Sequence, residues 1–251
     1  MLMLLLVQIE LLKTKRSLAL LMLFVCPLFV VVLQSLIMVK TGGSKIDEKG
    51  WAMLWAGANA IWCYFMLPLY IALITALLNG NEHKNATWRL MLSLPVQPIW
   101  LYLSKLTLAW LYTLIANLVL FLWVAVSIFL LKAFGYGAES FTFANALDYP
   151  FISQVSKTAI SCLPILIIQH AISWRYGNIV APLALGVIAT MGISQIGSSE
   201  YWVYYPWSYM TMSNMGSDSS MQLQAVWLAL GTAVFAILAT SIWLCRRETS
   251  V

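Results

Sequence analysis

The side chains that could do chemistry in this sequence are few and lie far apart. There are two histidines, His83 and His170, and they show no HExxH or other paired-ligand spacing. The four cysteines lie in or beside four different apolar runs without a CxxC pair, so no metal centre is expected. The motifs GxSxG and GxxxxGK[ST] do not occur. The sequence therefore predicts that this chain is not an enzyme.

Carboxylates are missing from the segments that are apolar enough to cross a bilayer. All nine Asp and Glu residues lie outside them, which disfavours an intramembrane aspartyl or metal protease and a carboxylate proton relay. Because the chain has no P-loop, we expect no cofactor in it. If ATP drives its function, ATP and Mg²⁺ are expected on a separate subunit.

Three polar residues within the apolar segments are candidates for a substrate path: Asn117, Gln169 and His170. The alternative is that they form hydrogen bonds between helices, which contribute about 0.6–2 kcal/mol each in a membrane. We favour hydrogen bonding, most clearly for Asn117.

The elements that position these residues are predicted to be transmembrane helices. Of 251 residues, 62% are hydrophobic and 9% charged, and the mean hydropathy is +0.85, more apolar surface than a soluble domain of this size can bury. The net charge of +5 forms no Lys/Arg stripe, so nucleic acid is not an expected partner. Six apolar runs predict an all-α integral membrane protein with six spans, at 17–39, 51–78, 106–131, 158–174, 179–196 and 223–244.

Residues 1–16 precede the first span. Leu2, Leu5 and Ile9 share one helical face, and the segment ends in three basic residues. This pattern predicts an amphipathic interfacial helix. The alternative is a ragged start to the first span.

Residues 197–222 form an aromatic extracytoplasmic segment before the last span. Tyr205, Pro206 and Trp207 lie within it, and its Tyr and Trp side chains suit the head-group level of a membrane. A re-entrant hairpin and a loop bound at the interface are equally compatible with this composition.

The stretch 79–105 is a polar interruption between the second and third spans. Trp88, Met91 and Leu92 fall on one helical face, and Pro95 ends the helix because proline lacks the backbone donor. We expect a short amphipathic helix lying across the membrane surface, in a position to contact a partner.

The distribution of basic residues predicts the orientation. With six spans, both termini and the 79–105 stretch share a side that holds nine Lys and Arg, against five on the other side. Acidic residues divide three against six. The positive-inside rule places both termini and this stretch in the cytoplasm.

Three stretches together carry a family resemblance: IELLKTKRS before the first span, EHKNATWRLMLSLPV after the second, and YPWSYM before the last. In this order they resemble ABC-2 type transporter permeases, and more narrowly the lantibiotic-immunity and bacteriocin-export branch. The resemblance covers nearly the whole chain. It rests more on the order and topology of the stretches than on any single motif.

The resemblance implies one permease domain over 1–251, in a bacterial cytoplasmic membrane. It implies a second permease, identical or related, and two copies of a separate ABC ATPase. The helix within 79–105 would be the coupling helix, which contacts the ATPase through Glu82, His83, Thr87, Trp88, Arg89, Leu92 and Pro95.

The cargo expected from the branch is a lantibiotic-like peptide or another amphipathic molecule such as a drug. The alternatives are a lipid, polysaccharide or other small-molecule exporter. A membrane scaffold or sensor that recruits a cytoplasmic partner without transport is an alternative of another class.

Overall fold

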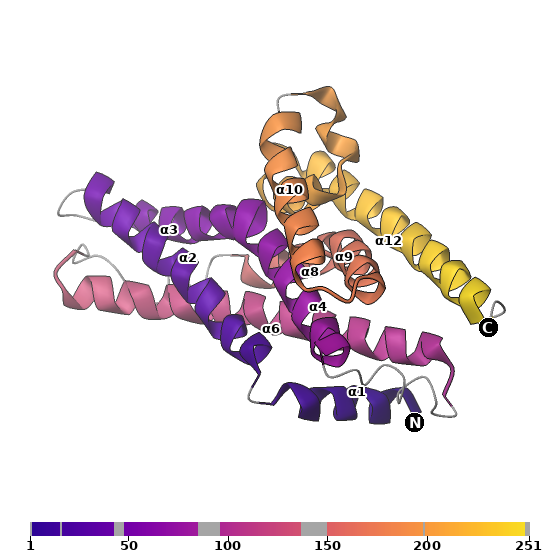
Figure 1. Cartoon of the computed structure of the whole chain (residues 1–251). Coiled ribbons are helices and arrows are strands. Elements are labelled where there is room, and N and C mark those ends of the chain that lie inside the picture. The colour runs from indigo at the N-terminus through magenta and orange to yellow at the C-terminus, as the bar shows by residue number, and fades with distance from the viewer. Residues whose placement is uncertain are drawn as a thin grey trace.

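The computed structural model describes residues 2–15, 17–42, 48–84, 96–136, 150–197 and 199–248, and the regular elements in this part of the chain are all helices (Figure 1). The longer helices are α1 (Leu2–Thr14), α2 (Leu18–Gly42), α3 (Glu48–Ile61), α4 (Leu67–Lys84), α6 (Pro98–Ala133), α8 (Phe151–Ser161), α9 (Leu163–Arg175), α10 (Val180–Ile196) and α12 (Ser219–Glu248). The shorter elements are the π-helical turn η1 (Trp62–Met66), the 3₁₀ turns η2 (Glu200–Tyr204) and η3 (Pro206–Ser208), and α11 (Tyr209–Met215).

Among these described residues, five helical segments are long and apolar enough to cross a membrane: Leu18–Thr41, Ala52–Gly80, Pro98–Ala133, Phe151–Arg175 and Ser219–Leu244. The prediction of an all-α multi-pass membrane protein is confirmed. The fifth predicted span corresponds to α10, which is apolar but has 17 residues, so the count of six spans stays a prediction.

Two helices begin earlier than the spans predicted in them. The helix of the third span, α6, begins at Pro98 and not at residue 106, and Lys105 lies inside it with its charge paired. The fourth begins at Phe151, seven residues before the predicted start, because the polar sequence FISQVSK folds as the amphipathic helix α8.

The second span changes direction in its middle, between α3 and α4 (Figure 1). Pro68 has no backbone N–H, so a regular helix would leave a carbonyl one turn earlier without its donor. The wider turn η1 lies directly before this proline and lets the chain continue as helix. The turn also brings Trp62, which is fully buried, into the centre of the bundle.

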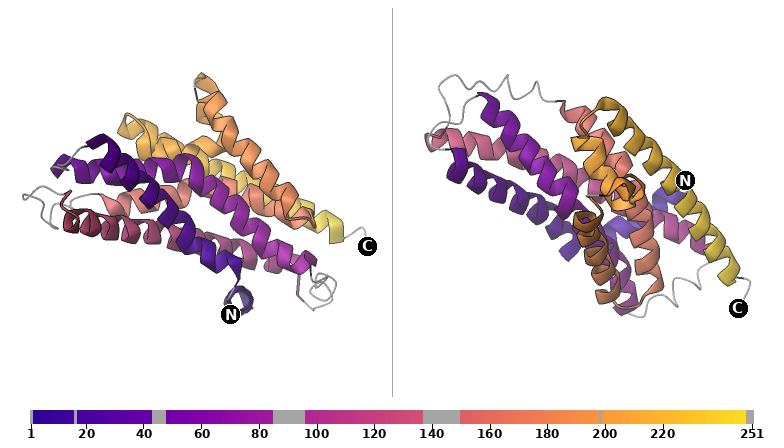
Figure 2. Two further views of the ribbon diagram at one scale, coloured as in Figure 1. Left: turned by 60° about the vertical axis from the view of Figure 1, so that its left-hand side comes forward. Right: turned by 90° about the horizontal axis from the view of Figure 1, so that it is seen from above.

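The bundle is built around α6, the longest helix. Its 36 residues extend over about 54 Å, well beyond the hydrocarbon core of a membrane of about 30 Å. Helix α1 packs on the outside of the N-terminal half of α6, while α2 and α12 lie at opposite edges (Figures 1 and 2). Helix α4 contacts α9, α10 and α6. Helix α11 packs against both α8 and α12.

Glycine allows α10 to approach α4 closely. A Cβ atom at Gly186 would lie 2.4 Å from the Cβ of Ala72 and 3.0 Å from Nε2 of Gln169. The distance of 2.4 Å is too short for a real contact, and Ala72 is fully buried and cannot yield, while the distance to Gln169 is tight. In a membrane such small residues let helix backbones pack by van der Waals contact.

We expect Gly186→Ala to lower the free energy of unfolding by about 1–3 kcal/mol, because the added methyl group overpacks the α10–α4 contact. Unfolding of the purified chain in detergent, followed by tryptophan fluorescence, measures this. The control is Gly231→Ala in α12, where a Cβ meets nothing within 4 Å. That variant should gain about 0.5–1 kcal/mol, since glycine is unfavourable within a helix. Equal changes in the free energy of unfolding for the two variants would contradict the close packing of α10 on α4 at Gly186.

Candidate functional site

Most of the predicted coupling residues lie outside the described part of the chain: Thr87, Trp88, Arg89, Leu92 and Pro95. Glu82 and His83 lie in the last turn of α4, of which the structure describes the backbone. The first and last residues of the predicted 79–105 loop are helical. Residues 79–84 continue α4 and residues 98–105 begin α6. Any connecting segment is therefore held by two long helices.

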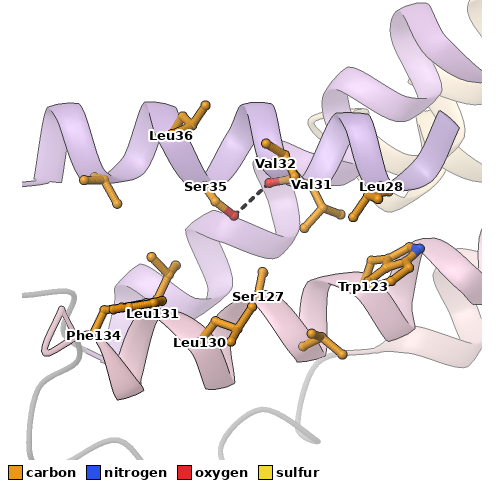
Figure 3. Close-up of a pocket in the computed structure, with 12 residues that line it drawn as sticks. Leu28, Val31, Val32, Ser35, Leu36, Trp123, Ser127, Leu130, Leu131 and Phe134 are labelled. Carbon is orange, nitrogen blue, oxygen red and sulfur yellow. Dashed lines mark hydrogen bonds between the residues drawn. The ribbon is translucent and has the colours of Figure 1, made fainter. Parts of the chain in front are cut away.

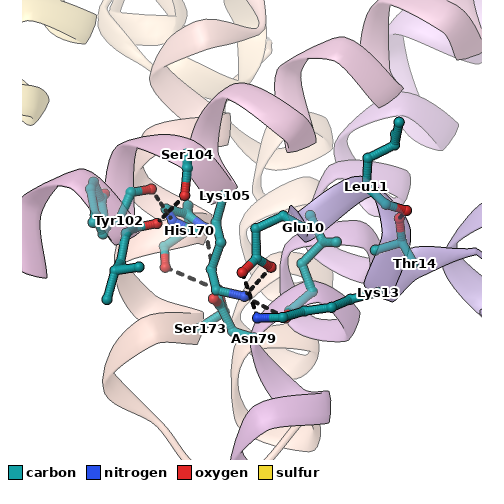
Figure 4. A network of polar contacts seen from close by, with 12 residues as sticks. Glu10, Leu11, Lys13, Thr14, Asn79, Tyr102, Ser104, Lys105, His170 and Ser173 are labelled. Atoms are coloured by element: carbon teal, nitrogen blue, oxygen red, sulfur yellow. Dashed lines mark hydrogen bonds and ion pairs between the residues drawn. The ribbon is translucent and has the colours of Figure 1, made fainter. Parts of the chain in front are cut away.

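A buried ion pair lies where these two helices meet α1 (Figure 4). Nζ of Lys105 is 2.8 Å from Oε2 of Glu10, and the lysine side chain is fully buried. Nζ of Lys13 is 2.7 Å from the other carboxylate oxygen. Lys105 also donates to the backbone carbonyl of Leu78, at 3.4 Å. One carboxylate thus binds α1 to α6, and one ammonium binds α6 to the end of α4.

Two opposing effects act on the carboxyl group of Glu10. Burial raises its pKa, but the charges and hydrogen bonds of Lys105 and Lys13 outweigh burial and hold the pKa below the ordinary value of 4.5. Glu10 is therefore charged at neutral pH. Removing either Lys105 or Lys13 would leave the buried charge of Glu10 incompletely compensated.

Helix α1 turns its polar side inward. Its two buried residues are Glu10 and Thr14, and the Thr14 hydroxyl hydrogen-bonds the phenol of Tyr112 on α6. Leu2, Leu5 and Ile9 of the predicted apolar face are exposed, as is Leu12, whereas Leu6 packs against the core. A helix that docks by polar contacts and exposes leucine differs from a helix on a soluble protein, and it suits an environment of lipid.

A neutral network continues from the ion pair into the bundle. Nδ2 of Asn79 lies 3.2 Å from Nδ1 of His170 and donates to Oγ of Ser173 at 2.6 Å. Nε2 of His170 lies 3.2 Å from the carbonyl oxygen of Tyr102. A carbonyl can only accept, so Nε2 carries the proton and Nδ1 accepts from Asn79. His170 is thus a neutral link between α4, α6 and α9.

Asn117 belongs to a different network. Its Oδ1 accepts a hydrogen bond from Nε1 of Trp62 at 2.8 Å, and its Nδ2 donates to the carbonyl of Thr113 at 2.8 Å. It also lines a cavity of about 10 Å³, which has room for one water, with Asn59 and Thr158. The structure therefore does not bring Asn117 together with His170. Its bond to Trp62 joins η1 to α6, and its bond to Thr113 lies within α6.

Gln169 differs from its neighbours in having no partner. It is fully buried in α9, and neither its amide oxygen nor its amide nitrogen has a hydrogen-bond partner. Its nitrogen faces the α10 backbone near Gly186. The role of Asn117, Gln169 and His170 in a substrate path stays a prediction.

The aromatic segment before α12 is helical and packs into the protein. Tyr205 donates to the carbonyl of Ala189 on α10 at 2.5 Å, and its ring stacks on Trp207 with centroids 5.6 Å apart. Pro206 begins η3, where a missing N–H costs nothing. Trp207 and the following Tyr209 and Met210 are buried.

Sequence reasoning missed Glu10, Lys105 and Asn79 as partners. A signal was present: Glu10 is the one acidic residue before the first span, and Lys105 stands directly before 26 uncharged residues. Ionisable residues beside such segments need a counter-charge, and the sequence offers few. Among the described residues, no group of three or more His, Cys, Asp or Glu could hold a metal ion.

We expect Lys105→Met to destabilise the chain by about 3 kcal/mol, because Glu10 then keeps a buried charge with Lys13 as its remaining lysine. Unfolding in detergent measures the loss. The double variant Glu10→Gln/Lys105→Met should recover part of it, since neither charge is then left buried. The control Lys157→Met removes a partly buried lysine bound to the neutral Gln222 and should cost less. Equal losses for the two lysines would contradict a special role of the pair.

The lowered pKa of Glu10 predicts a pH dependence. A carboxyl group with a depressed folded-state pKa contributes its full stability above the ordinary value of 4.5, and this contribution is lost as the pH falls through the folded-state pKa. The stability difference between wild type and Glu10→Gln should be constant near neutral pH and shrink in the acid range below 4.5. A difference that does not change with pH would show that Glu10 is not ionised in the fold.

Comparison with known proteins gives one finding. Residues 6–194, about three quarters of the chain, match a family described as ABC-2 family transporter protein. No curated protein and no solved structure matches the chain. The match begins within α1 and includes α4 and α6, the two helices that flank the predicted coupling segment. It also includes the polar residues Asn117, Gln169 and His170. The chain therefore belongs to the ABC-2 family of transporter proteins, multi-pass membrane proteins that associate with an ABC ATPase.

Proposed function

We propose that this chain is the six-span permease subunit of an ABC exporter that moves an amphipathic substrate out of the membrane or the cell. The family match over residues 6–194 carries the proposal. It is supported by five helical segments of spanning length and by α10, which is apolar but shorter. In this proposal both termini lie in the cytoplasm of a bacterium.

The arrangement of α4 and α6 supports the stretch 79–105 as the coupling segment. Helix α4 ends within this stretch and α6 begins within it, and Lys105 ties the two helices together through the carbonyl of Leu78. Glu10 adds α1 to the same point. A displacement imposed by the ATPase on the segment would therefore act on three helices at once. A binding partner can shift a protein between two conformations only if it contacts those conformations differently. Here the ATPase would supply the differing contacts.

The outer segment 197–222 is proposed to be re-entrant. Burial of Trp207, Tyr209 and Met210 supports this over a loop lying on the surface, since a surface loop would leave most of these side chains exposed. Tyr205 fixes the segment to α10. The segment would close the outer end of the path.

The proposed assembly has two permeases, as a homodimer or a related pair, and two ATPase subunits that bind ATP and Mg²⁺. The proposed cargo is a lantibiotic-like peptide, supported by the stretches IELLKTKRS, EHKNATWRLMLSLPV and YPWSYM. Lipids, polysaccharides and other small molecules are the alternative cargoes.

We expect Arg89→Ala to leave membrane insertion intact and to weaken association with the ATPase by about 1–2 kcal/mol, the usual cost of truncating an energetically important interface residue. Affinity purification of the tagged full-length chain, with the ATPase identified by its P-loop sequence and quantified, measures this. Cells expressing the chain and its ATPase should tolerate a lantibiotic better than cells expressing the Arg89→Ala variant.

The matched control is Arg175→Ala, which removes an exposed arginine from the α9–α10 turn on the same predicted side. It should change neither readout. Failure of the wild-type chain to bind any ABC ATPase would overturn the transporter proposal. Binding without lantibiotic tolerance would overturn the cargo alone.

A further inference from the structure

An open groove lies between α2 and α6, toward the C-terminal ends of both helices (Figure 3). Its volume is about 430 Å³, within the range of roughly 300–1,000 Å³ typical of small-molecule sites. The two helices diverge toward these ends, which opens the space between them (Figure 1). The lining is dominated by aliphatic side chains from both walls, among them Leu28, Val32, Leu36, Val126, Leu130 and Leu131.

The two hydroxyl groups in the lining are already used. Oγ of Ser35 donates to the carbonyl of Val31 at 2.7 Å, and Oγ of Ser127 donates to the carbonyl of Val124 at 2.7 Å. Each serine thus bonds to its own helix. Hydrocarbon suits such walls better than a polar molecule, which would lose hydrogen bonds to water without gaining partners.

The length of the groove equals the depth of one membrane leaflet. From Leu28 to Val39 the α2 wall extends over about 16 Å, and half of a hydrocarbon core is about 15 Å. An α-helix with its side chains is about 10 Å across, so 16 Å of it occupies roughly 1,200 Å³. The groove is too small for a helix of a second copy to insert, whereas a single extended hydrocarbon chain is thin enough.

Positive charges lie at one end of the groove. Lys40 is in the last turn of α2 and Lys132 is in the last turn of α6, and both are exposed. Their chain neighbours Val39 and Leu131 line the groove. The groove therefore offers apolar walls along one leaflet and two cations where that leaflet's head groups would lie.

We propose that the groove between α2 and α6 binds one acyl chain of an anionic phospholipid, whose phosphate-bearing head group is held by Lys40 and Lys132. This site is independent of the ATPase and of the cargo. The bound lipid would fill the space where α2 and α6 diverge and stabilise their separation.

Native mass spectrometry of the full-length chain in detergent tests the site, with phosphatidylglycerol and phosphatidylcholine of identical acyl chains as probes. The wild type should retain phosphatidylglycerol in preference to phosphatidylcholine. Lys40→Gln and Lys132→Gln should each reduce this preference about five-fold, the usual effect of one basic residue at an anionic membrane surface. Both lysines are exposed, and unfolding in detergent checks that each variant keeps the fold.

Val126→Trp fills the groove and should reduce retention of both lipids. The matched control Leu122→Trp adds the same indole to the lipid-facing side of α6 outside the groove and should change nothing. Equal retention of the two lipids by the wild type would overturn the proposal. Unchanged retention in Val126→Trp together with a shift from dimer to monomer would also overturn it, and would identify the groove as a contact between copies.

Discussion

Removing the charges of Glu10 and Lys105 from water costs several kcal/mol per ion, and their attraction repays this only when the geometry is good. The geometry here meets that condition. The carboxylate receives one lysine on each oxygen, at 2.7 and 2.8 Å, and the ammonium of Lys105 also reaches a backbone carbonyl of α4. Sliding α1 along α6 would separate the two buried charges, and sliding α4 along α6 would break the contact of Lys105 with the carbonyl of Leu78. The pair therefore fixes the relative positions of three helices at one end of the bundle.

The neutral network extends this fixed block to a fourth helix. Asn79 follows Leu78 on α4, and Tyr102 lies one turn before Lys105 on α6. Through His170 these two positions are joined to α9. Directional bonds thus connect α1, α4, α6 and α9 at the end of the bundle where α1 lies. The contact of α4 with α10 is of another kind, because it depends on close packing at Gly186, and Gln169 beside it leaves its amide unpaired at a cost of about 1–3 kcal/mol per group.

The fold could be predicted from the sequence wherever hydropathy alone decides, and not where a polar residue finds a partner far away in the chain. Long apolar runs predicted the helices, and Pro68, which is visible in the sequence, explains the change of direction between α3 and α4. The start of α6 could not be found, because Lys105 ends an apolar run by every local measure and its charge is compensated in a buried position by Glu10, 95 residues away. For the same reason the polar residues of the candidate site were recognised, while their separation into two networks depends on packing that the sequence does not display.

Helix α6 connects the hydrogen-bonded block of α1, α4, α6 and α9 to the apolar groove at the other end of the bundle. Over its length of about 54 Å, a tilt of about 5° around the end of α6 that contacts α1 displaces the far end by about 5 Å. No directional bond is described between the groove walls: the serines there bond to their own helices, and the contact of α2 with α6 is apolar. Apolar contacts in a membrane adjust more easily than hydrogen bonds, because lipid can replace a lost neighbour at little cost. The contact of α2 with α6 at the groove can thus adjust more easily than the hydrogen-bonded contacts among α1, α4, α6 and α9.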